Sequence, residues 1–249
     1  MKLLSFNVLN GAFHPADRLQ KVIQVIQSID PDVCLLQECT DWSLAQLKLL
    51  SRSLGMKHCH IVQCNPRSNK KCYNLSALSK TPFLEGKAHT PEIMAHGCQE
   101  LQLEGCPFPI FNIHLIAGSE EGRLQELEWF LGEERTGILA GDLNALSSDD
   151  PYPSDFASRL QEAGVDKYGH PPKFEVYKRL KEAGWSTPTP SDDQSWVTRW
   201  RNELDPPLPT RTDYIMAHGA ATETLKQIQI VPLQNEESDH FPVVATFQF

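Results

Sequence analysis

The chain has 249 residues, 40% of them hydrophobic and 22% charged, which is the composition of a globular protein with a full core. Its formal net charge of −9 argues against a protein that grips long nucleic acid through the phosphates. No apolar run approaches the roughly 18 residues of a membrane span. Asn7 and Asn10 interrupt the N-terminal apolar run, so a signal peptide is not expected either.

The seven cysteines predict reduced thiols. They include no C-x-x-C pair, and Cys34 lies inside an apolar segment, where a free thiol acts as a small hydrophobic side chain. Their spacings fit neither a disulfide framework nor a zinc site. A set of this kind is typical of a cytoplasmic protein.

The first part of the chain alternates between strand and helix patterns. Residues 2–8 predict a strand, and residues 16–29 carry apolar side chains at helical spacing before Pro31 ends the helix. Residues 32–38 contain four consecutive apolar residues, which favours a strand covered on both faces. A second helix is predicted over residues 41–54, with its leucines on one side.

The rest of the chain is richer in short strands. Five are predicted before the next helix, over residues 58–64, 75–79, 83–88, 98–104 and 108–115. A helix over residues 120–132 and a strand in the segment GILAGDLN follow. The chain ends with three more predicted strands, near residues 212–217, 225–231 and 243–248.

The stretch 149–210 is rich in proline and tryptophan and too long for a plain loop. It contains one helical piece, residues 172–185, and we expect it to form a surface excursion near the functional site. No repeat or linker divides the chain, so residues 1–249 are expected to form one domain. Strands alternating with helices predict an α/β fold, and the hairpin-length strands predict mixed, mostly antiparallel sheets with the helices outside.

Polar side chains gather at or beside the ends of six predicted strands: Asn7, Glu38, Asn112, His114, Asp142, Asn144, Arg211, Asp213, Ser238, Asp239 and His240. Burying such groups unpaired costs on the order of several kcal/mol each. They satisfy one another if the strand ends meet, and the result is an acidic pocket for a hard divalent cation. Taken singly, Asp142 and Asn144 also fit an Asx turn, and Glu38 a surface acid.

An ordered set of segments resembles the endonuclease/exonuclease/phosphatase family from the first strand to the last: LSFNVLNG, PDVCLLQE, YNLSALSK, FNIHL, GDLNA, RTDYIM and SDHFPV. The combination of GDxN, SDH and a Gln-Glu pair at a strand end is specific. The resemblance implies a four-layer α/β/β/α sandwich of two mixed, mostly antiparallel sheets. It also implies hydrolysis of phosphoesters with Mg²⁺ or Mn²⁺ as cofactor.

The resemblance assigns roles to matching residues. It implies that Glu38, Asn7 and Asp239 lie at the metal, that Asp142 orients or deprotonates the attacking water, and that Asn144 binds a phosphate oxygen. Asp213 would fix the tautomer of His240, and His240 and His114 would contact the phosphate. Further phosphate or substrate contacts would come from Asn74, Asn112 and Arg211. Two departures stand out: Tyr73 replaces a glycine of the family pattern, and Leu9 stands where some nucleases carry an aspartate.

The implied reaction is in-line attack of water on a phosphodiester. Because the chain is acidic, we expect a small or single-stranded substrate, a nucleotide or another phosphodiester, rather than duplex DNA. A DNA-repair nuclease, a phosphomonoesterase and a non-catalytic partner-binding domain of the same fold remain alternatives. The segments around Lys70 and around Arg199 and Arg201 are either a basic patch or solvated loops. The aromatic residues of the excursion either form a wall over the site or seat the excursion on the sandwich: Tyr152, Trp185, Trp196 and Trp200.

Overall fold

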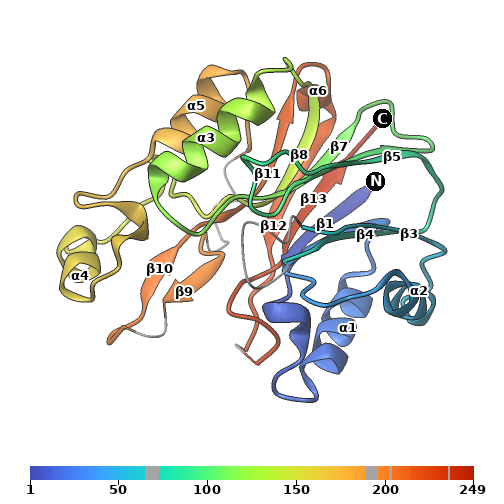
Figure 1. Cartoon of the computed structure of the whole chain (residues 1–249), viewed down its shortest axis with the longest axis horizontal. Helices are drawn as coiled ribbons and strands as arrows, with labels where there is room; N and C mark the ends of the chain where they lie inside the picture. Colours follow the sequence, from blue (N-terminus) through green and yellow to red (C-terminus); the bar gives the residue numbers. More distant parts are fainter. Residues whose placement is uncertain (65–72, 189–195, 202–203, 235) are drawn as a thin grey trace.

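The computed structural model describes residues 1–64, 73–188, 196–201, 204–234 and 236–249, with the backbone alone for Arg201. Two β-sheets lie face to face, and helices cover their outer faces (Figure 1). The four layers are therefore helices, sheet, sheet and helices. This is the predicted α/β/β/α sandwich.

The larger sheet has six strands in the order β12–β13–β1–β2–β4–β3. Only β1 and β2 pair in parallel, and the other neighbours are antiparallel. β1 and β2 are buried along almost their whole length, as expected for strands covered on both faces. The bounds are β1 (Lys2–Asn7), β2 (Val33–Gln37), β3 (His58–Val62), β4 (Leu75–Ser79), β12 (Leu225–Ile230) and β13 (Val243–Phe247).

The smaller sheet has five strands in the order β11–β8–β7–β6–β5. Here β7 and β8 form the parallel pair. The bounds are β5 (Phe83–His89), β6 (Cys98–Leu103), β7 (Ile110–His114), β8 (Gly137–Asp142) and β11 (Asp213–His218). Both sheets are thus mixed and mostly antiparallel, as predicted.

Helices α1 (Arg18–Ile29) and α2 (Leu44–Ser53) lie on the outer face of the larger sheet, and α3 (Glu120–Leu131) and α5 (Glu175–Glu182) lie beside the smaller one (Figure 1). Each of these four helices corresponds to a predicted helix and is slightly shorter than predicted. The shorter elements are η1 (Asn10–Ala12), α4 (Phe156–Glu162), η2 (Asp166–Tyr168) and α6 (Ala221–Thr224).

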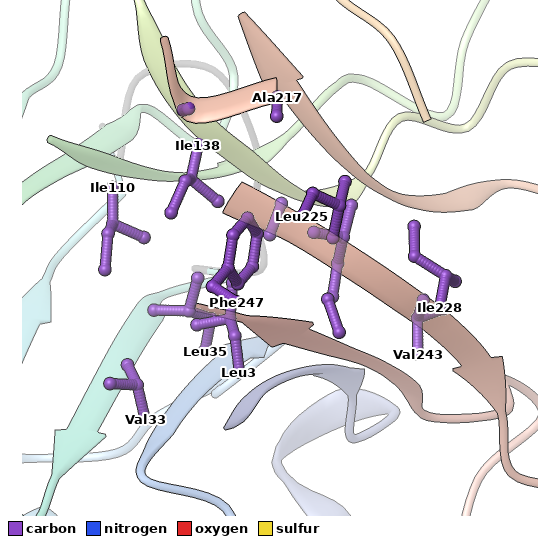
Figure 2. Close-up of a cluster of buried hydrophobic side chains, with 14 of the residues drawn as sticks. Leu3, Val33, Leu35, Ile110, Ile138, Ala217, Leu225, Ile228, Val243 and Phe247 are labelled. Carbon is purple, nitrogen blue, oxygen red and sulfur yellow. The ribbon is translucent and has the colours of Figure 1, made fainter. Parts of the chain in front are cut away.

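Three apolar clusters fill the three interfaces between layers. The central one lies between the sheets and includes Leu3, Leu35, Ile138, Val243 and Phe247, which Figure 2 shows converging from both sheets. A second cluster joins α1 and α2 to the larger sheet, and a third joins α3 and α5 to the smaller one. Burial of apolar area against both faces of each sheet stabilises the sandwich.

The excursion, residues 149–210, is more structured than the sequence predicts. It holds α4, η2 and α5, and its last part forms a two-stranded hairpin, β9 (Arg199–Arg201) with β10 (Leu208–Thr210). α5 lies within the predicted helical piece, residues 172–185, but the other pieces are too short for a periodic pattern to show. They fold over a small separate cluster of buried side chains: Leu146, Phe156, Leu160, Tyr168 and Leu208.

The aromatic residues of the excursion mostly serve packing. Trp185 is 1% exposed and belongs to the cluster under α3 and α5. Tyr152 stacks on Phe156 and contacts the ring of Trp196 edge-on. These contacts favour a hydrophobic seat for the excursion over an aromatic wall at the site.

Within the described ranges, no helix has the length and apolarity needed to cross a bilayer. The cysteines of the described residues are free: Cys34, Cys39, Cys59, Cys64, Cys98 and Cys106. The absence of disulfides among them agrees with the sequence analysis.

The strand register brings the predicted site residues to one edge. In the parallel pairs, Asn7 lies opposite Gln37 and His114 lies opposite Asp142. β11 runs antiparallel to β8, so its first residue, Asp213, also lies opposite Asp142. The carboxyl ends of β1, β2, β7 and β8 and the start of β11 therefore meet at the same end of the sandwich.

Candidate active site

Asn7 links the two sheets at this edge. Its Nδ2 lies 3.2 Å from Glu38 Oε1 and 3.0 Å from Asp142 Oδ2, so one amide group donates to a carboxylate of each sheet. Its Oδ1 accepts from the backbone N–H of Leu9. The opposite amide orientation would turn Oδ1 toward two carboxylates. The side-chain oxygen expected to hold a metal is therefore engaged by the backbone, and Asn7 positions the carboxylates.

Glu38 follows β2 in the left-handed backbone region, with φ of 56°. This turn aims its carboxylate back across the strand end, where Oε2 accepts from the backbone N–H of Asn10 at 2.9 Å. Burial raises the pKa of Glu38, although the bonds from Asn10 and Asn7 oppose that shift. A buried carboxylate with so few donors is stabilised by a nearby cation.

Asp142 and Asn144 form an Asx turn and a site pair at once. Asp142 Oδ1 accepts from the backbone N–H of Asn144 at 2.8 Å, while Oδ2 faces Asn7. Asn144 has φ of 49°, a conformation that asparagine tolerates better than most residues. The local turn and the functional reading of this segment are therefore not alternatives, because the turn orients both side chains.

Asn144 is fully engaged within the protein. Its Nδ2 donates to His114 Nε2 at 3.1 Å and to the carbonyl of Leu115 at 3.0 Å, and its Oδ1 accepts from Lys167 Nζ at 3.0 Å. This amide orientation is fixed, because the reverse one would place Nδ2 against the lysine ammonium. His114 Nε2 is therefore an acceptor, and its proton lies on Nδ1.

His114 stacks on a second buried histidine, His96, with ring centroids 4.5 Å apart. Burial lowers the pKa of His114 to about 3 and that of His96 to about 2, so both rings are neutral near pH 7. The Nδ1 atoms of both rings are buried and lack a hydrogen-bond partner among the described residues. Tyr73 contacts both rings. The site thus has a neutral imidazole pair on the β7 side.

His240, in contrast to these two neutral rings, is protonated. Its Nδ1 lies 2.8 Å from Asp213 Oδ2, and its Nε2 lies 3.8 Å from Asp142 Oδ2. Burial alone would lower the pKa of His240, but the carboxylates of Asp213, Asp239 and Asp142 raise it to about 9. Ser238 holds the loop, because its hydroxyl donates to the carbonyl of Asn7 and accepts from the backbone N–H of His240.

The excursion supplies contacts that the sequence analysis did not predict. Thr198 Oγ1 accepts from the backbone N–H of Asp213, and Arg199 pairs with the His240 backbone in a β-bridge. Arg199 Nη2 also lies 2.6 Å from Asp239 Oδ2. Burial would raise the pKa of Asp239, but His240 and Arg199 lower it overall. The segment around Lys70 and the side chain of Arg201 lie outside the described residues.

Three of the predicted substrate-binding residues have their contacts elsewhere. The amide of Asn74 bonds to the backbone of Cys64 and Trp42. Asn112 lies between the sheets, where it bonds to Gln37 and Gln99. Arg211 pairs with buried Asp150 at 2.7 Å and covers the rings of Tyr177 and Tyr214. Their contacts hold the scaffold together around the site.

Two further site residues are absent from the sequence analysis, His96 and Lys167. His96 precedes β6 in the segment AHGC, and Lys167 is the middle residue of η2. Neither belongs to a family segment nor to a periodic pattern. No signal in the single sequence distinguishes them from surface loop residues.

The donor set fits a hard divalent cation. Donor atoms of Asp142, Asp213 and His240 lie within 4.8 Å of one another, and Asn7 connects Asp142 to Glu38. Oδ1 of Asp213 and Oδ1 of Asp239 are buried without a hydrogen-bond partner among the described residues. Carboxylate oxygens are the ligands that Mg²⁺ and Mn²⁺ prefer. Asp142, Asp213 and Asp239, with Glu38 joined to Asp142 through Asn7, are the carboxylates available to such an ion.

Solved structures with this fold align over the whole chain. An AP endonuclease from Archaeoglobus fulgidus aligns with a TM-score of 0.74, 18% identity and 100% coverage of both chains. A 3′-5′ exonuclease from Neisseria meningitidis, NExo, gives 0.70 and 19%. A point variant of NExo from Neisseria, described as a 3′ phosphatase and bound to product DNA hairpin, gives 0.68 and 18%. Both NExo alignments also cover the two chains in full.

In sequence, no curated protein matches the chain. The profile of the Endonuclease/Exonuclease/phosphatase family matches residues 4–240, from the first strand to His240. This range includes every strand end that meets at the site. The chain belongs to the endonuclease/exonuclease/phosphatase family.

Proposed function

We propose that the protein is a divalent-metal-dependent phosphodiesterase. The observation that carries this proposal is the position of Asp142, whose Oδ2 lies 3.0 Å from Asn7 Nδ2, 3.6 Å from His114 Nε2 and 3.8 Å from His240 Nε2. One carboxylate thus faces a metal-side residue and two imidazoles, of which His114 is neutral and His240 is protonated. That arrangement suits attack of water on phosphorus, because base, charge stabiliser and ion site converge on one point.

In this proposal Asp142 orients the attacking water and accepts its proton. His240 carries a proton through neutral pH, so it serves as an electrostatic partner of the phosphoryl oxygens and not as the base. Asp213 fixes the orientation of that imidazole. Glu38 and Asp239 would hold Mg²⁺ or Mn²⁺, which neutralises charge on the phosphoryl group when bound.

The substrate is proposed to be small or single-stranded. The support for this is the net charge of −9, which disfavours a long polyanion. The aligned structures include an endonuclease, an exonuclease and a 3′ phosphatase. Nuclease and phosphomonoesterase activities are therefore the alternative outcomes of the experiment below.

The experiment compares hydrolysis of bis(p-nitrophenyl) phosphate and p-nitrophenyl phosphate with Mg²⁺, with Mn²⁺ and with EDTA. The test variant is Asp142→Asn, and the control is Asp155→Asn, which makes the same change at an exposed residue of the excursion. We expect metal-dependent release from the diester, at least about 10³-fold lower in Asp142→Asn and unchanged in the control.

Release from the monoester alone would replace the proposal with a phosphatase. A protein that binds Mg²⁺ and hydrolyses neither compound is next assayed with nucleotide diesters and short single strands. No hydrolysis of any of these, together with no stabilisation by Mg²⁺, would favour the non-catalytic, partner-binding alternative.

A further inference from the structure

Lys167 reaches the site from the excursion. Its Nζ lies 3.0 Å from Asn144 Oδ1, on the side of the amide opposite to His114. Its charge also reaches two other site residues. Burial is the main cause of the lowered pKa of His114, and Lys167 adds to it; Lys167 likewise helps to lower the pKa of Asp239. The ammonium thus lies beside Asn144, just beyond the β8 end, and acts electrostatically on His114 and Asp239.

The hydrogen bonds of Asn144 show why the position of Lys167 beside it matters. Both hydrogens of its amide are donated, one to His114 Nε2 and one to the carbonyl of Leu115. They are not available to a phosphate unless those bonds break. The lysine ammonium has three hydrogens and donates one of them to Asn144, so donors remain beside the amide. Lys167 is therefore better placed than Asn144 to make the phosphate contact that was expected of Asn144.

Lys167 also differs from Arg199, another cation that the excursion brings to the site. Arg199 is ion-paired with Asp239 at 2.6 Å. For Lys167, in contrast, the described part of the chain offers no carboxylate within ion-pair distance. Its nearest aromatic partner is its own neighbour Tyr168, whose ring centroid lies 4.8 Å from Nζ. Among the described residues, Lys167 therefore has no ion-pair partner.

A buried arginine of α3 fixes the backbone of Lys167. Its carbonyl accepts from Nη2 of Arg123, which is fully buried in α3 and paired with Glu120 at 2.9 Å. Glu120 in turn accepts from the backbone N–H of Val176 at the start of α5. Tyr168, the residue after Lys167, is 0% exposed and anchors the chain on that side. With the backbone already fixed, only the side chain of Lys167 remains to be ordered on a ligand.

We propose that Lys167 is a catalytic residue that binds a non-bridging oxygen of the scissile phosphate and stabilises the charge that develops there during attack. This proposal rests on the proposed phosphoesterase function. The equatorial oxygens of a phosphoryl group carry the negative charge of the transition state, and fixed cations in a partly dry site stabilise it. The excursion then completes the active site, since it delivers this cation.

Four variants test the proposal. Lys167→Met removes charge and donor, Lys167→Gln keeps a neutral donor for Asn144, and Lys167→Arg keeps the charge. Lys173→Met is the matched control, because Lys173 is an exposed lysine of the same segment. Two readouts are taken with Mg²⁺ present: kcat and KM for the diester, and the affinity for inorganic phosphate by calorimetry. Thermal unfolding verifies that each variant is folded.

We expect kcat/KM to fall about 10²-fold in Lys167→Met and in Lys167→Gln, with orthophosphate bound about 10-fold more weakly. Lys167→Arg should recover most of both losses, and Lys173→Met should match the wild type. If Lys167→Gln behaves like the wild type, Lys167 only orients Asn144 and the proposal is wrong.

The two proposals fail in different ways. If the wild type hydrolyses the diester and Lys167→Met does so equally well, the role of Lys167 is refuted and the phosphodiesterase proposal stands. If the wild type hydrolyses nothing but loses orthophosphate binding in Lys167→Met, the phosphate contact is supported and the proposed reaction is not. If the wild type neither hydrolyses substrate nor binds orthophosphate, both are wrong.

Discussion

His240 Nδ1 donates to Asp213 Oδ2 across 2.8 Å, and the two side chains are each about 2% exposed. Burial by itself would favour a neutral ring, but three surrounding carboxylates raise the pKa of His240 to about 9. The imidazolium is therefore the resting state, and its second nitrogen faces Asp142. In the proposed reaction this pair leaves the role of base to Asp142, because a ring that already holds its proton cannot take up another.

The Asp213–His240 pair predicts a loss of stability at alkaline pH in the metal-free protein. The folded-state pKa of His240 is raised above the value of about 6.5 for an unfolded chain. Its contribution is therefore fully present below about pH 6.5 and is lost as the pH rises through about 9. Urea unfolding in EDTA at pH 6.5 and pH 9.5 measures this loss, at most about 1.4 kcal/mol per pH unit.

Asp213→Asn removes the largest of the charges that raise this pKa, so the difference between the two pH values should shrink. Asp155→Asn, at an exposed site, should keep the wild-type difference. An unchanged difference in Asp213→Asn would show that the pair does not hold the proton on His240.

The stacked histidines predict the opposite sign at acid pH. Burial lowers the pKa of His96 to about 2 and that of His114 to about 3, so the unfolded chain binds more protons than the folded one below pH 6.5. Stability should fall from pH 6.5 to pH 4, by up to about 1.4 kcal/mol per pH unit for each ring. His96→Phe keeps an aromatic ring against His114 but cannot take up a proton. Its urea midpoint should therefore depend less on pH over this range, and a slope equal to the wild type would contradict a neutral His96.

The proposed ion site predicts that metal binding stabilises the fold through Glu38. A ligand at 100 times its Kd stabilises the native state by about 2.7 kcal/mol, so Mg²⁺ or Mn²⁺ should raise the Tm and EDTA should reverse the rise. Glu38→Gln should lose this response, whereas Glu121→Gln, on the exposed side of α3, should retain it. If Glu38→Gln kept the full rise in Tm with metal, Glu38 would not be a ligand, and the ion would be assigned to Asp142 and Asp239. Differential scanning fluorimetry across a metal titration gives the comparison.

Most of the fold could be predicted from the sequence because each long element has its own apolar pattern. β4 begins and ends at its predicted residues, and α1 keeps the predicted stripe with Val22 and Ile26 buried. Apart from α5, the excursion could not be predicted in the same way. Its elements are held by one another and by α3, so their order comes from tertiary contacts such as the bond from Arg123 to Lys167.

The site was predicted where strand ends meet and was missed where a loop side chain enters from elsewhere. Asp142, Asp213 and His240 converge as polar strand ends should. Asn112 gives the same sequence signal and lies on the same strand face as His114, but it is two residues farther from the end and therefore lies between the sheets. Along β7, a polar residue thus reaches the site only at the last position of the strand, and the sequence does not reveal that limit.

Gly141 predicts a sharp cost for any side chain beside the site. It has φ of +145°, and a Cβ there would lie 1.8 Å from the carbonyl oxygen of Ile113 on the neighbouring strand β7. Ala at this position must separate the parallel pair β7–β8, which places His114 opposite Asp142. We expect Gly141→Ala to cost at least about 3 kcal/mol of the free energy of unfolding.

Gly55 is the matched control for that substitution, because it has φ of +69° and nothing within 4 Å of the added Cβ. Gly55→Ala should cost only the backbone strain, about 1–2 kcal/mol. Urea unfolding of both variants separates the clash from the strain. Equal costs would mean that β7 and β8 accommodate the methyl group. A larger cost for Gly141→Ala, with diester hydrolysis reduced in whatever fraction stays folded, would show that close backbone contact between these strands holds Asp142 in register with His114.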